Sequence, residues 1–305
     1  MKKKWFFIPV VSILLIGVIL GSFLDLEINK GIYDPQNGFG LFIAAFGETP
    51  AYALLGTFAY GFIYLAIHHY KKPSQRFILI LIAILGVAFC TYFQGKHIFD
   101  KNAYYTHDIV TKLLGYGIGF AIALLGGVAG YFLFKSNTCS AKELLLILIV
   151  AYGLLAAANG FNQVLKMIMA RPRYRVVVDH PDIFCNWWEL GRSHREYYTT
   201  NFPELYASED FRSFPSGHMA NIATVLYLLP MLKRINSHIK LKDGYLIGFA
   251  AIWAIIIAYT RIRVGAHFLS DVSLGALFAT VFSYIANEFY LYFHKKIEDK
   301  PVLNE

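Results

Sequence analysis

Charge is scarce in this sequence. Only 16% of the 305 residues are charged, while 57% are hydrophobic and the mean hydropathy is +0.48. Soluble domains carry roughly 25% charged residues, so this composition excludes an ordinary soluble protein and indicates a polytopic membrane protein. In such a protein the net charge of +8 reports first on membrane topology, and we expect no nucleic-acid partner.

Cysteine is scarce as well. Cys90 lies inside an apolar run, Cys139 in a short polar loop and Cys185 alone in a long loop. Three scattered thiols exclude a disulfide framework and a Cys-x-x-Cys metal site. The chain also lacks an internal repeat and a Pro/Ser-rich or Gly-rich linker. We therefore predict a single integral membrane domain over residues 1–305.

What the sequence has in abundance is apolar runs long enough to cross a bilayer. They are Trp5 to Leu24, part of Phe39 to Ile67, Phe77 to Phe93, Leu113 to Phe134, Leu144 to Leu165, Ser216 to Leu232, Gly244 to Tyr259 and Val272 to Phe293. These runs predict an all-α membrane helix bundle of about eight transmembrane helices, the first of them an uncleaved helix. Gly47-Glu48-Thr49-Pro50 interrupts the second run, so Phe39 to Phe46 is open to being a separate interfacial or re-entrant piece.

The basic residues alternate from loop to loop. The two ends and the loops 68–76, 135–143 and 233–243 hold 15 Lys and Arg residues, against 4 in the loops 25–38 and 94–112. By the positive-inside rule both termini are predicted to be cytoplasmic. The basic residues between Lys166 and Arg212, with Arg261 and Arg263, then fall on the outer side against the rule. A long loop can cross the membrane whatever its charge. The basic residues that adjoin helix ends are harder to explain in that way, which suggests that they serve the chemistry of a site.

The first of three polar clusters follows the fifth run. Lys166, Arg171, Arg173 and Arg175 stand within ten positions, with no acidic residue among them. Such a cluster fits either contact with lipid headgroups or a cradle for a phosphate dianion.

The second cluster, Pro215-Ser216-Gly217-His218, opens an apolar helix. Proline in a first turn, a Ser hydroxyl and a Gly that lets the backbone come close favour an anion at the helix N-terminus. Alone, the same four residues fit an ordinary helix cap.

The third cluster lies between the last two apolar runs and holds Arg261, Arg263, His267 and Asp271. If the segment from His267 is helical, His267 and Asp271 are one turn apart and face the same way. A carboxylate there can hold one imidazole nitrogen and leave the other basic. Arg261 adds a planar fork of donors for phosphate or carboxylate oxygens. The alternative is an ion-paired helix end.

The three clusters are expected on one face of the membrane. Between His218 and Arg261 the chain crosses twice, with the basic loop 233–243 between the crossings. Between Lys166 and His218 it does not cross at all. The face is predicted to be the outer one.

The three clusters give three motifs in order along the chain: Lys166-x6-Arg173, Pro215-Ser216-Gly217-His218 and Arg261-x5-His267-x3-Asp271. Together they resemble the three-part signature of the type 2 phosphatidic acid phosphatase (PAP2) superfamily of membrane lipid phosphatases. The resemblance covers Leu144 to Phe293, about half of the chain, as a PAP2-like catalytic core. Residues 1–143 resemble the family only as additional hydrophobic helices.

The resemblance implies a role for each matching residue. His267 is implied as the nucleophile that forms a phosphohistidine, with Asp271 as its orienter and His218 as the general acid. The implied phosphate ligands are Lys166, Arg173, Ser216, Gly217 and Arg261. Two positions depart from the family pattern: Tyr174 stands where Pro is usual, which puts the pose of Arg173 in question, and Thr260 stands where Ser is usual.

Elementary chemistry agrees with these roles. Phosphoryl transfer needs cations on the equatorial oxygens and an in-line pair of groups, one attacking and one protonating the leaving oxygen. Two His and a carboxylate, His218, His267 and Asp271, can instead hold a metal ion. Lys166, Arg173 and Arg261 would repel that ion, so we expect no metal and no other cofactor.

The sequence therefore predicts a phosphatase that acts on an isoprenoid or glycerolipid phosphate or diphosphate at the outer face of the bilayer. A phosphotransferase of the same family is the first alternative. An anion transporter is the second, and the clustering of charge at one face rather than near mid-membrane speaks against it. The expected partners are a lipid phosphate and the bilayer, and the sequence indicates no oligomeric state.

Overall fold

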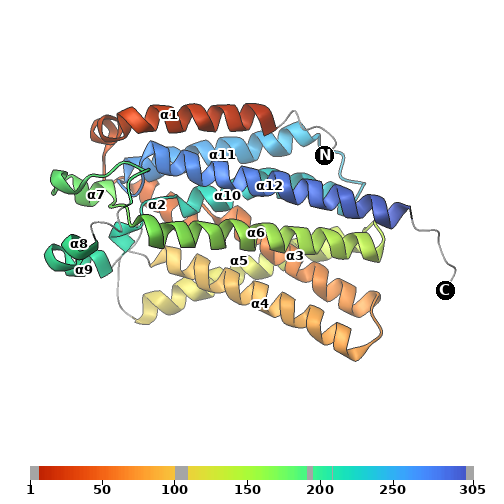
Figure 1. Cartoon of the computed structure of the whole chain (residues 1–305). Coiled ribbons are helices and arrows are strands. Elements are labelled where there is room, and N and C mark those ends of the chain that lie inside the picture. The colour runs from red at the N-terminus through yellow and green to blue at the C-terminus, as the bar shows by residue number, and fades with distance from the viewer. Residues whose placement is uncertain (1–6, 100–108, 191–194, 208, 300–305) are drawn as a thin grey trace.

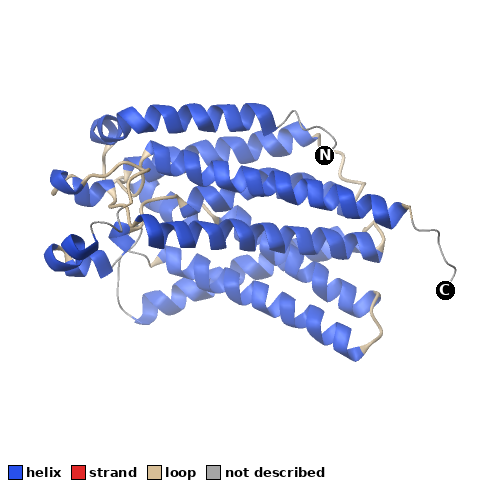
Figure 2. Cartoon of the chain, viewed as in Figure 1, coloured by secondary structure: helices blue, strands red, loops and turns tan. Residues whose placement is uncertain are grey.

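The computed structural model describes residues 7–99, 109–190, 195–207 and 209–299. Every regular element in these ranges is a helix, as Figure 2 shows. The N-terminal part contains α1 (Phe7–Ile32), α2 (Gly38–Phe46), α3 (Thr49–His68), α4 (Pro73–Ile98) and α5 (Ile109–Lys135). The C-terminal part contains α6 (Ala141–Met169), α10 (Gly217–Ile235), α11 (Asp243–Arg263) and α12 (Leu269–Glu298). The predicted helical membrane bundle is confirmed.

The long helices run side by side along one axis (Figure 1). Helices α3, α4 and α5 pack against one another, α1 packs against α12, and α6 joins the two groups through α3, α10 and α12. The helices approach closely where a residue lacks a side chain: a Cβ on Gly56 of α3 would lie 2.5 Å from the carbonyl oxygen of Ala123 on α5. Small residues at such crossings are the usual means of packing helices in membranes.

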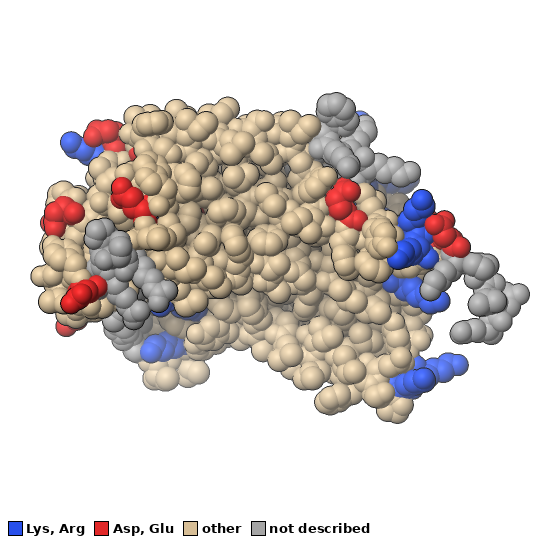
Figure 3. Space-filling view, in the orientation of Figure 1, with Lys and Arg blue, Asp and Glu red and all other residues tan. Residues whose placement is uncertain are grey.

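The middle of the bundle exposes large apolar side chains, such as Phe23 at 81% and Leu125 at 68%. On the face drawn in Figure 3, the middle of the molecule is free of Lys, Arg, Asp and Glu, which gather toward its two ends. Among the described residues, seven segments are long and apolar enough to cross a membrane: α1, α2 with α3, α4, α5, α6 with the residues that follow it as far as Val177, α11 and α12. This surface is what a bilayer requires.

The remaining run expected to span, Ser216 to Leu232, also forms a helix, α10, but is not among the seven. Its first turns carry His218, Asn221 and Thr224 and its last turn Lys233 and Arg234, which lower its hydropathy. Most of α10 is buried, and it packs against α3, α6, α11 and α12. Protein rather than lipid surrounds its polar side chains, so α10 needs no apolar surface.

The break at Gly47–Pro50 divides the second apolar run as expected. Helix α2 ends before it and α3 begins at Thr49, with Pro50 in its first turn. Short helices connect α6 to α10 at one end of the bundle (Figure 1). They are α7 (Tyr174–Val177), η2 (Pro181–Ile183), α8 (Arg195–Asn201), α9 (Pro203–Ala207) and η4 (Glu209–Phe211).

Candidate functional site

The three polar clusters meet at the end of the bundle where α7, α8 and α9 lie (Figure 1). Lys166 is in the last turn of α6, and its Nζ is 3.8 Å from the place a Cβ on Gly217 would occupy. The Ser216 N–H donates to the backbone carbonyl of Asp271 at 3.0 Å. The structure thus brings together segments that are about 50 residues apart in the sequence.

Ser216 is the N-cap of α10, and its hydroxyl accepts a hydrogen bond from the Met219 N–H at 3.4 Å. Helix α12 packs closely against this cap because its residue at the contact is a glycine. A Cβ on Gly275 would lie 2.5 Å from the Ser216 carbonyl oxygen. The first N–H groups of a helix have no intrahelical partner and favour an anion. The start of α10 is therefore an anion-binding feature beside the Lys166 ammonium.

His267 lies in the link between α11 and α12 and is 1% exposed. Its Nδ1 is 2.6 Å from the backbone carbonyl oxygen of Ser213. A carbonyl can only accept, so Nδ1 carries the hydrogen and, in the neutral ring, Nε2 keeps its lone pair. The direct hydrogen bond expected between His267 and the Asp271 carboxylate is not formed, since Asp271 Oδ2 lies 3.9 Å from His267 Nδ1.

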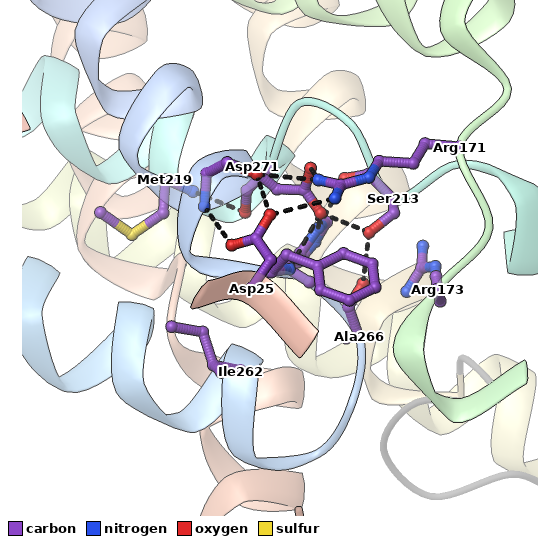
Figure 4. A network of polar contacts seen from close by, with 12 residues as sticks. Asp25, Arg171, Arg173, Ser213, Met219, Ile262, Ala266 and Asp271 are labelled. Carbon is purple, nitrogen blue, oxygen red and sulfur yellow. Dashed lines mark hydrogen bonds and ion pairs between the residues drawn. The ribbon is translucent and has the colours of Figure 1, made fainter. Parts of the chain in front are cut away.

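Hydrogen bonds connect Asp271 to His267 by way of Ser213. Its Oδ2 accepts hydrogen bonds from the Ser213 hydroxyl at 2.5 Å and from the Phe268 N–H at 2.9 Å. Its Oδ1 accepts from Arg171 Nη1 at 2.6 Å. The carboxylate thereby fixes Ser213 (Figure 4), whose backbone carbonyl accepts the hydrogen bond from His267 Nδ1–H.

Arg171, which the sequence left without a role, joins this network to the first helix. Its Nη2 donates to Oδ2 of Asp25 on α1 at 3.0 Å, and its guanidinium lies 4.2 Å from the centre of the Phe268 ring. Asp25 also accepts from the backbone N–H of Ser270 at 3.0 Å and from its hydroxyl (Figure 4). The sequence signal for Asp25 was its position as the first carboxylate after a long apolar run.

Arg173 is buried, at 4% exposure, and Glu209 holds it in place. Its Nε donates to the Glu209 carbonyl at 2.7 Å, and its Nη2 is 3.9 Å from the Glu209 carboxylate. Tyr174, the departure from the family pattern, begins α7 and packs its ring edge-on against Phe268. Burial raises the pKa of Glu209, but the surrounding cations, Lys166 and Arg173 followed by Lys96 and Arg212, together hold that pKa below its ordinary value. The carboxylate balances part of the positive charge.

Arg261 is 1% exposed in the last turn of α11, beneath the link that carries His267. The neighbouring Thr260 is buried and turns its hydroxyl to the Ile256 carbonyl of its own helix. Burial and then the nearby cations Arg173, Arg261 and Lys166 lower the pKa of His267 well below its ordinary value. The imidazole is therefore neutral at neutral pH in a strongly positive environment.

His218 lies in the first turn of α10, and its partners come from the N-terminal part of the chain. Its Nδ1 is 3.0 Å from Oε1 of Glu48, and its Nε2 is 3.1 Å from the Ala44 carbonyl oxygen. The His97 ring lies edge-on at 4.9 Å. Sequence reasoning did not connect Glu48 with His218, although an acidic residue at a break in an apolar run was the available signal.

The sequence pointed to His218, His267 and Asp271 as possible metal ligands, whereas the structure groups His218 with other residues. Asp271, from that set, has both oxygens bonded to Arg171, Ser213 and Phe268. Within the described ranges, the group whose ligand atoms all lie within 4.8 Å of one another is Glu48, His97 and His218. Removal of divalent ions tests whether a metal acts there.

A cavity of about 270 Å³ opens beside the Lys166 end of the site. It is lined by Lys166, Met167, Ala170, Tyr206, Phe211 and Arg212. A lining that combines apolar side chains with the two cationic ones, Lys166 and Arg212, suits an amphipathic anion.

Comparisons with known proteins identify the family and several relatives of this chain. Residues 144–295 match the family model of the PAP2 superfamily. Over 157 residues, 52% of the chain, the sequence is 29% identical to lipid A 1-phosphatases of Rhizobium etli and Rhizobium johnstonii, covering 57% and 54% of those proteins. Over 91 residues, 30% of the chain, it is 31% identical to phosphatidylglycerophosphatase B of Haemophilus influenzae, covering 36% of that protein. The chain thus spans little more than half the length of the first two, and no solved structure matches it.

Proposed function

This chain belongs to the PAP2 superfamily through residues 144–295, and we propose that it is an integral membrane phosphatase that hydrolyses a lipid phosphate or diphosphate. The observation that supports this proposal best is the environment of His267. Its imidazole is buried, its Nδ1 is hydrogen-bonded, and the charges of Lys166, Arg173 and Arg261 act on it. The names of its relatives denote phosphatases of lipids. An isoprenoid or glycerolipid phosphate is the substrate class that we propose.

In the first step, the lone pair of His267 Nε2 attacks phosphorus as the bond to the lipid oxygen breaks. Lys166, Arg173, Arg261 and the start of α10, with Ser216 and Gly217, bind the equatorial oxygens and stabilise their charge. His218 donates its proton to the leaving oxygen, which departs as the lipid alcohol. Asp271 and Ser213 hold the His267 ring, and its Nδ1–H donates to the Ser213 carbonyl throughout.

In the second step, water attacks the phosphohistidine and the N–P bond breaks. His218, now neutral, accepts the proton of the attacking water, and inorganic phosphate leaves. Both histidines return to their starting states, so the cycle consumes only lipid phosphate and water. A lipid or sugar hydroxyl in place of that water would make the protein a phosphotransferase.

The direct test is release of inorganic phosphate by purified protein from a panel of isoprenoid and glycerolipid phosphates. We expect turnover to persist in strong chelators, because Lys166, Arg173 and Arg261 supply the positive charge that a metal supplies elsewhere. Vanadate, which mimics pentacoordinate phosphorus, is expected to inhibit. Turnover that chelation abolishes and one divalent metal restores would assign the chemistry to a metal at Glu48, His97 and His218. Anion uptake without phosphate release would favour a transporter.

We further propose that both termini are cytoplasmic and that the site faces outward, since Lys and Arg gather in the loops at the opposite end. A cysteine at Thr200, exposed on α8, should label from outside intact cells. One at Ser237, exposed between α10 and α11, should label only after permeabilisation. Both belong in a background without Cys90, Cys139 and Cys185. The reverse pattern would place the site in the cytoplasm.

A further inference from the structure

Glu48 is a buried carboxylate outside the region that matches the family. It stands between α2 and α3 and is 3% exposed. Its Oε2 accepts hydrogen bonds from the Tyr52 hydroxyl at 2.7 Å and from Asn221 Nδ2 at 2.5 Å. Its Oε1 is 3.0 Å from Nδ1 of His218. A buried carboxylate is costly unless it is paired and hydrogen-bonded, so these contacts hold it in one orientation toward the histidine.

The two nitrogens of His218 both face acceptors. Nδ1 faces the Glu48 carboxylate, and Nε2 faces the backbone carbonyl of Ala44 at 3.1 Å. A neutral imidazole has one N–H, whereas the imidazolium has two. A hydrogen bond from His218 to the Glu48 carboxylate needs the hydrogen on Nδ1, so Nε2 is the nitrogen left to exchange a proton with the substrate. The Glu48 contact therefore decides which nitrogen of His218 serves as the general acid.

We propose that Glu48 is a positioning residue for His218: its carboxylate accepts a hydrogen bond from Nδ1–H and fixes the ring plane, and Nε2 exchanges its contact with the Ala44 carbonyl for one with the lipid oxygen. This inference rests on the proposed phosphatase function. When the proton leaves Nε2, the Nδ1–H bond to Glu48 remains, and the same bond keeps the ring in place to accept the proton of the attacking water. No proton passes to Glu48, so the balance of both steps is unchanged.

The proposal also gives the N-terminal helices a part in the reaction. Asn221, one turn after His218 on α10, and Tyr52 on α3 both donate to Glu48 Oε2. Glu48 therefore ties the start of α3 to the helix that carries the general acid. The other ionisable group beside it is His97 of α4, whose Nε2 is 3.6 Å from Glu48 Oε2 and 3.3 Å from the Tyr52 hydroxyl.

The test is Glu48→Gln, which keeps the shape of the side chain and removes its charge. We expect kcat/KM to fall on the order of 10 to 10² with a lipid phosphate, whose alkoxide needs a proton, and by less than about threefold with nitrophenyl phosphate, whose phenolate leaves unaided. Glu48→Asp should recover part of the loss. In a His218→Ala background, Glu48→Gln should cost nothing further, because the two residues act as one unit.

The matched control is Glu143→Gln. Glu143 also pairs with a histidine, His294 at 3.1 Å, but at the opposite end of α6 from Lys166, and it should keep wild-type kinetics. If Glu48→Gln does not fold, Tyr52→Phe removes one donor to the carboxylate and should show the same dependence on the leaving group, to a smaller extent.

Three results would overturn the proposal: equal losses on both substrates, wild-type kinetics in Glu48→Gln, or a loss that chelation of the wild-type protein reproduces. A wild-type protein that releases no phosphate from either substrate would instead refute the phosphatase function itself.

Discussion

His267→Ala should be inactive toward every phosphate substrate. The proposed cycle passes through a bond between phosphorus and His267 Nε2, so loss of the ring removes the covalent route rather than slowing it. Brief exposure of the wild-type protein to labelled substrate followed by alkaline quenching should yield an acid-labile phosphoprotein, and the variant should yield none. Both should unfold at similar temperatures, because alanine leaves the links among Asp271, Ser213 and Arg171 intact.

His180→Ala is the matched control, since His180 lies in the connection between α6 and α10 and packs its ring against Phe202 at 4.8 Å. It should form the phosphoprotein as the wild type does. Nitrophenyl phosphate activity that survives in His267→Ala and is lost in His218→Ala would mean that the two histidines have the reverse roles.

The same histidine sets the acid limit of the reaction. Burial and then the surrounding cations hold the pKa of His267 well below its ordinary value. Protonation inactivates a nucleophile, so a lowered pKa moves the loss of activity to lower pH. With nitrophenyl phosphate, kcat/KM per substrate dianion should stay level as the pH falls through about 6.5, the ordinary imidazole pKa. A midpoint at or above that pH would contradict the arrangement.

Arg171→Met should be among the most destabilising substitutions in the chain. The guanidinium donates to two carboxylates, Asp25 at 3.0 Å and Asp271 at 2.6 Å, and all three side chains are at most 3% exposed. Breaking a buried pair costs about 3 to 5 kcal/mol because a charge remains uncompensated, and here two charges remain. Thermal unfolding in detergent should show the loss as a large fall in Tm.

Arg263→Met is the control, because Arg263 pairs with Asp34 at 3.1 Å while both side chains are about one-third exposed. Solvent screens an exposed pair and each partner keeps its hydration when the other is removed, so this Tm should hardly change. Asp25→Asn added to Arg171→Met should restore part of the stability by removing one unpaired charge. Equal Tm values for the two arginine variants would show that Arg171 does not hold α1 to the core.

Much of the fold followed from the sequence because polar groups exposed to the hydrocarbon of a bilayer cost free energy. Long apolar runs had to become helices, and the charges that interrupt them had to gather at helix ends. Counting the crossings between His218 and Arg261 was enough to expect Lys166, His218 and His267 at one end, where the structure has them. The count of spanning helices differs from the expected eight at α10. A helix needs an apolar surface only where it contacts lipid, and α10 is surrounded by protein.

The sequence by itself thus determined the helical class and the set of chemical groups that meet at one end of the bundle. Only the tertiary structure decided which group touches which. His267 donates to the Ser213 carbonyl rather than to Asp271, Arg171 joins Asp271 to Asp25, and Glu48 reaches His218 from 170 residues away. The physical reason is that hydropathy and spacing fix where a helix runs, whereas its rotation and depth against its neighbours depend on side-chain packing across the whole bundle.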